Sequence, residues 1–446
     1  MPAEAASSSR RKAILAASLV ALPVIPFFAI LFYFAINIPV LDDYDGGLDY
    51  LNHLTQLPGF WARFLYCITA QHNEYKTLFA NAIVWIQVAI FGHIDFRLTC
   101  FLGNLFVLLI GVVLWKMFLP KREDLANRLL LFSPVIFMLF QLNYVQTLNW
   151  ALPGLQNLAV VGFVIAAIHF LMQDSIASYY AGLASMVLAI SSSTNGFFLV
   201  PIGVLILFNR RGFVRAGVLI LIACLCLGIY LFHYTLMPSL RPEHHSLAVT
   251  VFRNLTFLLS FLGNALFLPK QASLGLGLII VSCLGYITWR GYWRRNPTVG
   301  YCLLFVLLTA VTVTGIRSQT GLWEGTSSRY RIYCDLLMIF GWFFFAEECI
   351  QDDPESLRRN RPFMAVFTAS LLFCVLMDAG GIFSLHKRNH DLIRGLALYQ
   401  HPQPMQPPGP ATPMPGQGPE YDRWSVHARE VLDRSIQLGI YRPPSY

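Results

Sequence analysis

Apolar segments long enough to cross a membrane recur along this chain, and they constrain its fold more than any other feature. The first runs from residue 13 to residue 40 and follows the basic stretch Arg10-Arg11-Lys12. This segment is far longer than the ~7–15 apolar residues of a secretory signal peptide, so we expect a retained transmembrane helix with residues 1–12 in the cytoplasm. Only 13% of the residues are charged, against about 25% in soluble domains, which indicates an integral membrane protein.

Clusters of lysine and arginine between the apolar segments predict the direction of each crossing, because such residues are enriched in cytoplasmic loops. All the clusters can be cytoplasmic only if two apolar segments, 77–91 and 251–269, fail to cross. We expect both to form interfacial or re-entrant helices on the outer side. The net charge of +8 follows from these cytoplasmic clusters. We therefore do not expect nucleic acid as a partner. The clusters are Arg10/Arg11/Lys12, Lys116/Lys121/Arg122/Arg128, Arg210/Arg211/Arg215, Arg290/Arg294/Arg295 and Arg358/Arg359/Arg361.

The sequence therefore predicts an all-α polytopic membrane protein with about 11 transmembrane helices, within a range of 10–13, and an external C-terminus. Two predicted crossings, 177–191 and 197–208, are shorter than the ~20 residues that cross alone. We expect them to form a shallow pair around the polar turn 191–196, with a polar indentation on the outer face. The predicted crossings are 13–40, 96–118, 128–142, 155–173, 177–191, 197–208, 213–237, 272–289, 298–316, 330–349 and 362–384.

The chain divides into a transmembrane core over residues 13–400, whose first external loop covers 41–95, and an external C-terminal portion. Residues 401–420 are rich in proline and glycine, which predicts an extended linker. The segment 421–446 places Trp424, Ala428, Val431, Leu432 and Ile436 at helical spacing. This pattern predicts a short external helix that docks on an apolar surface.

The best candidates for a catalytic base are Asp43 first and Asp42 second, which directly follow the first apolar segment. Partial desolvation at the membrane interface raises the pKa of a carboxyl group and makes it a better base. Gly46-Gly47 gives the backbone freedom to turn back toward the bilayer. The alternative is that these acids are a solvated helix flank, and the roles of Asp45 and Asp49 stay open.

Other polar residues are predicted to share the outer face with this acidic stretch. The loop end "HNEYK" and the late loop "SSRYRIY" supply cations that suit an anionic phosphate, and "NWALPG" supplies polar groups at a membrane mouth. Each motif has an alternative reading. "HNEYK" is then a surface turn, the arginines of "SSRYRIY" reach up to lipid headgroups, and "NWALPG" is an ordinary helix end. The candidate substrate- or phosphate-binding residues are His72, Glu74, Lys76, Asn149, Trp150, Arg317, Arg329, Tyr330 and Arg331.

No sequence motif of a nucleotide-binding, zinc-protease or serine-hydrolase site stands in a suitable context. Asp42, Asp43, Asp45 and Glu74 offer the oxygen ligands that hard divalent cations prefer. Such sites need about six oxygens, and we favour chemistry without a metal or any other cofactor.

Three short motifs resemble those of the GT-C superfamily of integral membrane glycosyltransferases. "LDDYD" (41–45) is similar to the acidic first-loop motif of that family, "HNEYK" (72–76) to the polar end of the loop, and "SRY" (328–330) to a late external arginine-tyrosine pair. The tandem prolines that follow the lysine in the aminoarabinose and mannose transferase branches are missing here, which leaves the role of Lys76 open.

The resemblance implies a transferase that takes a sugar from a polyprenyl-phosphate donor and gives it to a glycan, lipid or protein acceptor. An aspartate would act as general base with inversion at the sugar. The active site would lie on the periplasmic or external face, in a bacterial inner membrane. The alternatives are a transporter or flippase of a lipid-linked or anionic substrate, and a scaffold that binds a partner through its acidic loop and tail.

Overall fold

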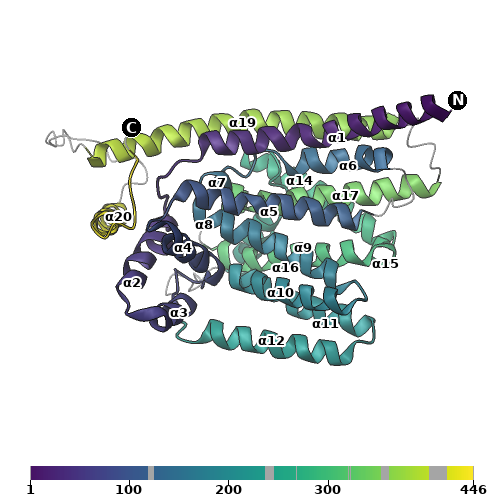
Figure 1. Cartoon of the computed structure of the whole chain (residues 1–446). Coiled ribbons are helices and arrows are strands. Elements are labelled where there is room, and N and C mark those ends of the chain that lie inside the picture. The colour runs from purple at the N-terminus through teal and green to yellow at the C-terminus, as the bar shows by residue number, and fades with distance from the viewer. Residues whose placement is uncertain are drawn as a thin grey trace.

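The structure is a computed structural model that describes residues 2–118, 125–236, 246–267, 269–319, 321, 323–352, 361–400 and 419–444. The described residues form helices joined by short turns, with two isolated β-bridges. The long helices run side by side (Figure 1), and the two chain ends lie at opposite ends of the bundle. Residues 401–418 of the expected linker 401–420 lie outside the described residues, and its last two residues begin a helix (Pro419–Gln437). The basic residues Lys121, Arg122, Arg358 and Arg359 also lie outside the described residues.

Eleven apolar helices make up most of the bundle. The first half of the chain contributes α1 (Pro2–Phe34), α5 (Phe96–Met117), α6 (Leu125–Leu139), α9 (Ala159–Leu171), α10 (Ile176–Ser192) and α11 (Leu199–Asn209). The second half contributes α12 (Phe213–Leu231), α14 (Lys270–Trp289), α16 (Pro297–Arg317), α17 (Arg331–Asp352) and α19 (Arg361–Gln400).

The remaining elements connect these helices and cover the ends of the bundle. They are η1 (Asp43–Asp49), α2 (Tyr50–Gln56), α3 (Gly59–Thr69), α4 (Leu78–Phe91), α7 (Val145–Leu148), α8 (Ala151–Pro153), η2 (Gly154–Leu158), η3 (Thr194–Phe198), α13 (Leu247–Leu262), α15 (Tyr292–Arg295), η5 (Glu324–Thr326), η6 (Ser328–Tyr330) and α20 (Pro419–Gln437).

The chain is a multi-pass helical membrane protein. Among the described residues, seven helical segments are long and apolar enough to cross a membrane. Of the other four predicted crossings, those on α6, α10 and α11 fall on shorter apolar helices. The fourth falls on α17, a helix of 22 residues that carries three acidic residues among its first 18 and a fourth acidic residue at its last position. The count of eleven crossings therefore stays a prediction. The seven segments are Lys12–Phe34, Phe96–Met117, Ala151–Leu171, Phe213–Leu231, Lys270–Trp289, Pro297–Arg317 and Arg361–Gln400.

The two apolar segments that were expected not to cross form short helices. α4 has 14 residues and α13 has 16, so at 1.5 Å per residue neither spans the ~30 Å hydrocarbon core alone. Figure 1 shows α4 beside α2 and α3, at the end of the bundle that lies opposite the N-terminus.

Polar side chains define where several helices begin. The carboxylate of Asp95 accepts hydrogen bonds from the backbone N–H groups of Arg97 and Leu98 and so caps α5. The Asn296 side chain caps α16, and Pro297 follows it at the first helical position. These side chains satisfy backbone donors that have no partner inside the helix.

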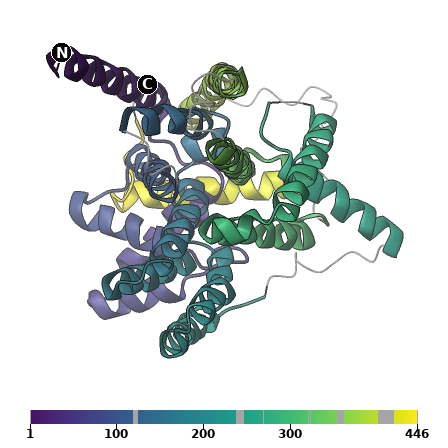
Figure 2. The ribbon, with the colours of Figure 1, turned by 90° about the vertical axis from the view of Figure 1, so that its right-hand side faces the viewer.

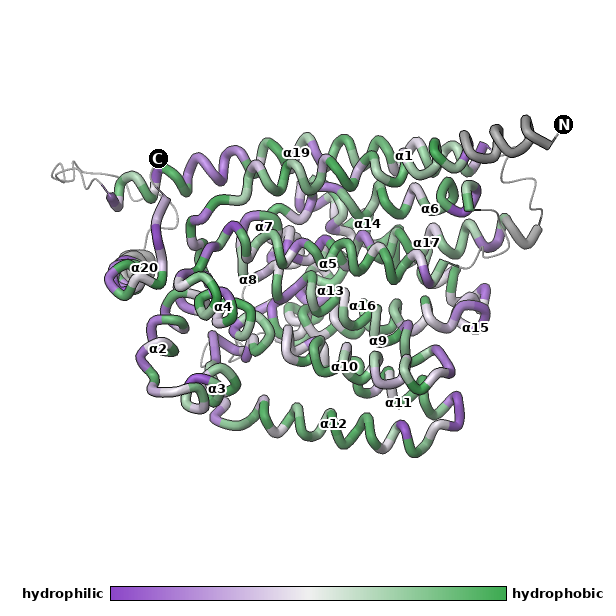
Figure 3. Tube along the Cα trace, viewed as in Figure 1, coloured by the Kyte–Doolittle hydropathy of each residue, from purple (hydrophilic) through white to green (hydrophobic). Residues whose placement is uncertain are grey.

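The polar ends of the bundle agree with the expected charge asymmetry. Figure 3 shows hydrophilic segments at the turn between α11 and α12 and at α15, both at the end of the bundle where the chain begins. Arg210 and Arg211 lie in that turn, and Arg294 and Arg295 belong to α15. Three of the basic clusters thus share one side of the molecule with the N-terminus, as the positive-inside rule requires.

The first helix ends six residues before the end of the expected crossing 13–40. α1 ends at Phe34, and the chain then runs without regular structure to Leu41, which has a positive φ of 46°. The π-helix η1 starts two residues later. Asp42 and Asp43 therefore do not continue the transmembrane helix, because a bend in the backbone separates them from it.

The last long helix continues beyond the expected crossing 362–384. α19 has 40 residues, which corresponds to about 60 Å of helix, twice the thickness of the hydrocarbon core. Figure 1 shows α19 projecting past the neighbouring helices toward α20. α20 is seen end-on in Figure 1 and from the side in Figure 2, so it lies across the bundle axis.

The polar turn between α10 and α11, where we expected a polar indentation, is engaged in helix packing. Its Asn195 donates a hydrogen bond to the Tyr333 hydroxyl on α17, and Thr194 Oγ1 lies 3.1 Å from the Tyr230 hydroxyl on α12. A Cβ atom on Gly196 would lie 2.4 Å from the backbone of Ala189. The turn thus needs glycine at this position and fastens α10 to α12 and α17.

Candidate active site

Asp43 is buried at the junction between the first loop and α8. Its side chain is 1% exposed, and its carboxylate accepts hydrogen bonds from the backbone nitrogens of Val40 (3.1 Å), Leu152 (3.0 Å) and Ala151 (3.4 Å). Burial raises the pKa of this carboxyl group to about 7. The Asp43 carboxylate therefore uses its hydrogen bonds to hold η1 against α8.

Asp42, the neighbouring residue, faces a different environment. Its side chain is 35% exposed, and its Oδ1 atom lies 3.6 Å from His72 Nε2. The carboxylate also acts electrostatically on the Tyr75 hydroxyl and the Arg329 guanidinium. The structure thus places Asp42 beside His72 and within electrostatic range of Arg329, and it leaves the Asp42 carboxylate accessible.

Gly46 and Gly47 serve the site through their small size. Neither has a positive φ, so the expected role of flexible turn glycines is wrong. A Cβ atom on Gly46 would lie 2.8 Å from the Leu152 side chain and 3.4 Å from the His72 ring. Glycine at position 46 therefore lets the Leu152 side chain pack closely on the backbone of η1, with the His72 ring in contact beside it.

A tight turn positions the polar end of the first loop. His72 and Tyr75 exchange backbone hydrogen bonds of 3.0 and 3.1 Å, and Asn73 between them has a positive φ of 51°. The turn directs Glu74 toward α16, where its carboxylate forms an ion pair with Arg317. Burial raises the pKa of Tyr75 to about 12, so its hydroxyl group stays protonated and can donate a hydrogen bond.

A glutamine holds Arg329 and Tyr330 in place at the start of α17. Gln146 Oε1 accepts hydrogen bonds from Ser327 Oγ (2.6 Å) and from the backbone nitrogen of Arg329 (3.2 Å). The Arg329 guanidinium lies 5.1 Å from the centre of the Tyr330 ring. Its buried Nε atom has no hydrogen-bond partner among the described residues. This cation therefore has a spare donor and lies within electrostatic range of Asp42.

Two cations that were predicted to bind phosphate contact the protein instead. Lys76 is 3% exposed and donates a hydrogen bond to the carbonyl of Phe232, and burial lowers its pKa. Arg331 donates to Asn264 Oδ1 (3.1 Å) and to the carbonyl of Asn143 (2.7 Å). The structure does not bring these two cations to the accessible face of Asp42.

Asn149 and Trp150 lie beside the buried Asp43, against the outer half of α19. Asn149 Nδ2 donates to Asn389 Oδ1 at 3.2 Å, and the Arg388 guanidinium lies 5.7 Å from the Trp150 ring centre. Asp43 acts electrostatically on Arg388. Sequence reasoning missed Arg388 and Asn389 because it ended the last helix at residue 384, although the polar run 386–391 was a signal.

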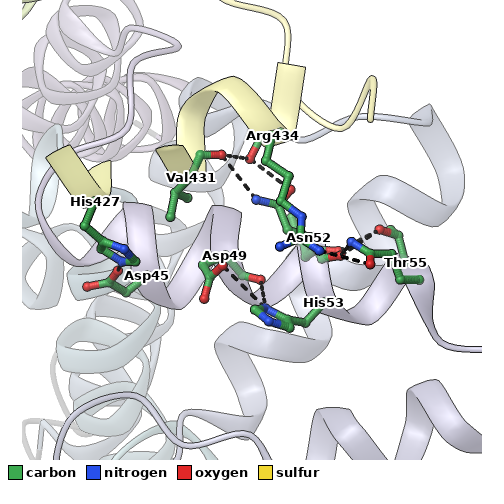
Figure 4. Close-up of polar contacts among 11 residues, drawn as sticks. Asp45, Asp49, Asn52, His53, Thr55, His427, Val431 and Arg434 are labelled. Atoms are coloured by element: carbon green, nitrogen blue, oxygen red, sulfur yellow. Dashed lines mark hydrogen bonds and ion pairs between the residues drawn. The ribbon is translucent and has the colours of Figure 1, made fainter. Parts of the chain in front are cut away.

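Asp45 and Asp49, whose roles were open, face the C-terminal helix and α2. Asp45 Oδ1 lies 2.7 Å from His427 Nε2 on α20, and Asp49 Oδ1 lies 3.4 Å from His53 Nδ1 (Figure 4). The buried Asn52 donates to the carbonyl of Val431 at 3.2 Å. Residues from the first loop and from the C-terminal helix therefore build this end of the bundle.

The described residues offer no group of three or more histidine, cysteine, aspartate or glutamate side chains that could hold a metal ion. The end of the bundle opposite the N-terminus offers an accessible carboxylate, a neighbouring imidazole and a guanidinium within electrostatic range. Such a set can accept a proton from one group while it stabilises negative charge on another. No protein-family profile matches the chain, and no curated protein matches its sequence.

Proposed function

We propose that this protein is a membrane glycosyltransferase of the GT-C kind, which moves a sugar from a polyprenyl-phosphate donor to an acceptor hydroxyl on the outer face. The observation that carries the proposal is the accessible carboxylate of Asp42, which lies 3.6 Å from His72 and within electrostatic range of Arg329. A base and a cation at the outer end of the bundle are what this displacement requires.

The reaction is a single displacement. The acceptor oxygen forms a bond to the anomeric carbon while the bond between that carbon and the phosphate oxygen breaks, which inverts the configuration. Asp42 takes the hydroxyl proton, and the lipid phosphate leaves with the bonding electrons. Arg329 stabilises the negative charge on the leaving phosphate, as a guanidinium pairs well with phosphate oxygens.

Each group has an expected contribution to the rate. A positioned general base typically supplies ~10²–10⁴-fold, and the loss of one preplaced donor typically costs ~10²–10³-fold in kcat. Asp42 is preferred to Asp43 as the base because three backbone N–H groups already occupy the buried Asp43 carboxylate. Glu74 and Arg317 support the site by fastening the first loop to α16.

The membrane setting follows the same proposal. The chain crosses about eleven times, with its N-terminus in the cytoplasm and the first loop outside, in a bacterial inner membrane. The donor's lipid tail lies in the bilayer and presents its phosphate and sugar to Asp42 at the outer interface. The free energy of the reaction comes from the donor linkage, and no cofactor takes part.

Turnover of the donor tests the proposal directly. The purified protein in nanodiscs is incubated with a panel of polyprenyl-phosphate hexoses and pentoses, together with an extract of envelope glycans as acceptor. We expect the release of polyprenyl phosphate from at least one donor, with transfer of its sugar. No release from any donor, by a protein with a normal thermal unfolding transition, would contradict the proposal.

A transporter of lipid-linked or anionic substrates is the second candidate, and one observation favours it. The buried Asp335 on α17 accepts hydrogen bonds from Gln141 Nε2 (2.9 Å) and Asn143 Nδ2 (3.2 Å), and ionisable residues inside membrane helices often mark transport pathways. Proteoliposomes loaded with a fluorescent polyprenyl-phosphate sugar distinguish the two. Movement of intact donor between leaflets, without loss of its sugar, would favour transport.

A further inference from the structure

A polar pocket of about 240 Å³ lies between η1, the tight turn at 71–73 and α4. Its wall includes His72, whose Nε2 atom lies 3.6 Å from Asp42 Oδ1. The pocket is therefore separated from the proposed base by one imidazole ring. It is lined by Asp45, Gly46, Asp49, Tyr50, Tyr66, Ala70, Gln71, His72, Asn73 and Asn81.

A buried amide in the pocket wall is only half satisfied. The Asn81 side chain is 4% exposed, and its Oδ1 atom accepts a hydrogen bond from Thr77 Oγ1 at 3.3 Å. Its Nδ2 group has no hydrogen-bond partner among the described residues. Asn81 lines the pocket, and its Nδ2 atom is not among the fully buried polar atoms without a partner, so this donor is open to the pocket. It can therefore donate a hydrogen bond to an acceptor on a ligand.

Two tyrosine rings and two carboxylates complement that donor. Tyr50 and Tyr66 are stacked, with ring centres 5.6 Å apart and an angle of 8° between the planes. Asp45 and Asp49 are about one-third exposed and so remain able to accept further hydrogen bonds. Flat rings that pack on C–H groups, together with acceptors and donors for hydroxyl groups, suit a sugar ring.

The volume and the charge of the pocket limit which ligands it can bind. Drug-sized ligands occupy roughly 300–1,000 Å³, so 240 Å³ suits a single monosaccharide unit. The two carboxylates make the pocket repel anionic groups and attract an amino group. A phosphate head group or a uronic acid would therefore be disfavoured in this pocket.

We infer that this pocket binds the terminal sugar of the acceptor, and that this sugar is neutral or carries an amino group. The inference rests on the proposed transferase function and names its acceptor as a glycan. A hydroxyl group of the bound sugar that reaches past His72 meets Asp42, which takes its proton. His72 acts as a positioning residue, and Asn81 and Asp49 bind the sugar.

Direct binding tests the pocket without catalysis. Saturation-transfer difference NMR on the full chain in nanodiscs uses methyl glucoside, methyl glucosaminide and methyl glucuronide as probes. We expect the first two to bind and the glucuronide to bind at least tenfold more weakly. Equal binding of the glucuronide, or no binding of any probe, would overturn the inference.

Two variants and a matched control assign the signal to this pocket. Asn81→Leu should weaken binding of methyl glucoside about tenfold, the effect of one lost hydrogen bond to a ligand. Asp49→Asn should reduce the discrimination against the glucuronide, a change that loss of folding would not produce. Asp391→Asn removes an exposed carboxylate on α19 and should leave binding unchanged. Unaltered discrimination in Asp49→Asn would contradict the inference.

The outcome also separates this inference from the proposed function. Sugar binding that the pocket variants abolish, in a protein that consumes no lipid-phosphate donor, would support the pocket and contradict the transferase. Donor consumption with an acceptor KM that Asn81→Leu leaves unchanged would support the transferase and overturn the pocket.

Discussion

Asp42 Oδ1 lies 3.6 Å from His72 Nε2, while the carboxylate of the next residue, Asp43, is buried and accepts hydrogen bonds from three backbone N–H groups. Two adjacent aspartates thus have separate tasks. Asp43 fixes the first loop to α8, and this contact holds Asp42 at an accessible position beside His72. The distinction assigns stability effects to one residue and rate effects to the other.

Asp43 should make the stability of the protein fall between pH 4 and pH 7. Its pKa is raised from 3.8 to about 7 by burial, so the folded protein holds this proton more tightly than the unfolded chain. The resulting stabilisation is fully present below pH ~4 and is lost as the pH rises through 7. Thermal unfolding in detergent across this range measures the effect.

Asp43→Asn should remove this pH dependence and lower the stability by about 1–3 kcal/mol, because its amide nitrogen would face a backbone donor. Asp391→Asn, at an exposed position on α19, serves as the control and should retain the wild-type profile. An Asp43→Asn protein with the wild-type pH profile would show that Asp43 is not the titrating group.

Arg329→Gln should lower kcat by ~10²–10³-fold with little change in stability, because the side chain stabilises the leaving phosphate. Arg329→Lys should recover only part of the rate, since an ammonium cannot pair with phosphate in a bidentate manner. Steady-state release of polyprenyl phosphate measures both. Arg394→Gln, at an exposed position on α19, is the matched control, and equal losses in Arg329→Gln and Arg394→Gln would refute the assignment.

Gly277→Ala should destabilise the protein strongly, whereas Gly275→Ala on the same helix should not. A Cβ atom on Gly277 would lie 2.1 Å from the carbonyl oxygen of Leu259 on α13, while one on Gly275 would meet nothing within 4 Å. Small residues at such crossings let two helix backbones approach closely. Thermal unfolding of the two variants compares them, and equal midpoints would contradict the close packing of α13 on α14.

Asn52→Ala should release α20 from the first loop. Asn52 is fully buried, donates to the carbonyl of Val431 and accepts from Ser435 Oγ at 3.0 Å. Its loss leaves buried groups unpaired at a cost of about 1–3 kcal/mol. Limited proteolysis should then cleave the C-terminal segment faster. Gln56→Ala is the control: it removes the exposed contact with Arg434 and a bond within α2 to the carbonyl of Asn52, and it leaves the Asn52 side chain in place. A similar increase in that variant would argue against a specific role of the Asn52 side chain.

Hydropathy and charge predicted the membrane class and most of the helices, because apolar length and basic clusters are local properties of the sequence. They also placed the acidic first loop at the end of the bundle opposite the N-terminus. The end of α1 at Phe34 and the extension of α19 to Gln400 were missed. Both ends take part in tertiary contacts, because Asn389 on α19 donates to the carbonyl of Phe34 and pairs with Asn149.

The composition of the site was predictable only in part. Short motifs led to Asp42, His72 and Arg329, and the structure places Asp42 beside His72 and within electrostatic range of Arg329. The same motifs gave no way to tell the accessible Asp42 from the buried Asp43, because that difference arises from backbone donors more than a hundred residues away. Lys76 likewise fits the motif but contacts the carbonyl of Phe232.

The rate of polyprenyl-phosphate release by Asp42→Asn, compared with that of the wild-type protein in nanodiscs, tests the central claim most directly. We predict a loss of ~10²–10⁴-fold, with an unchanged thermal midpoint and unchanged binding of methyl glucoside. Release at the wild-type rate by the folded Asp42→Asn protein would contradict the assignment of Asp42 as the base.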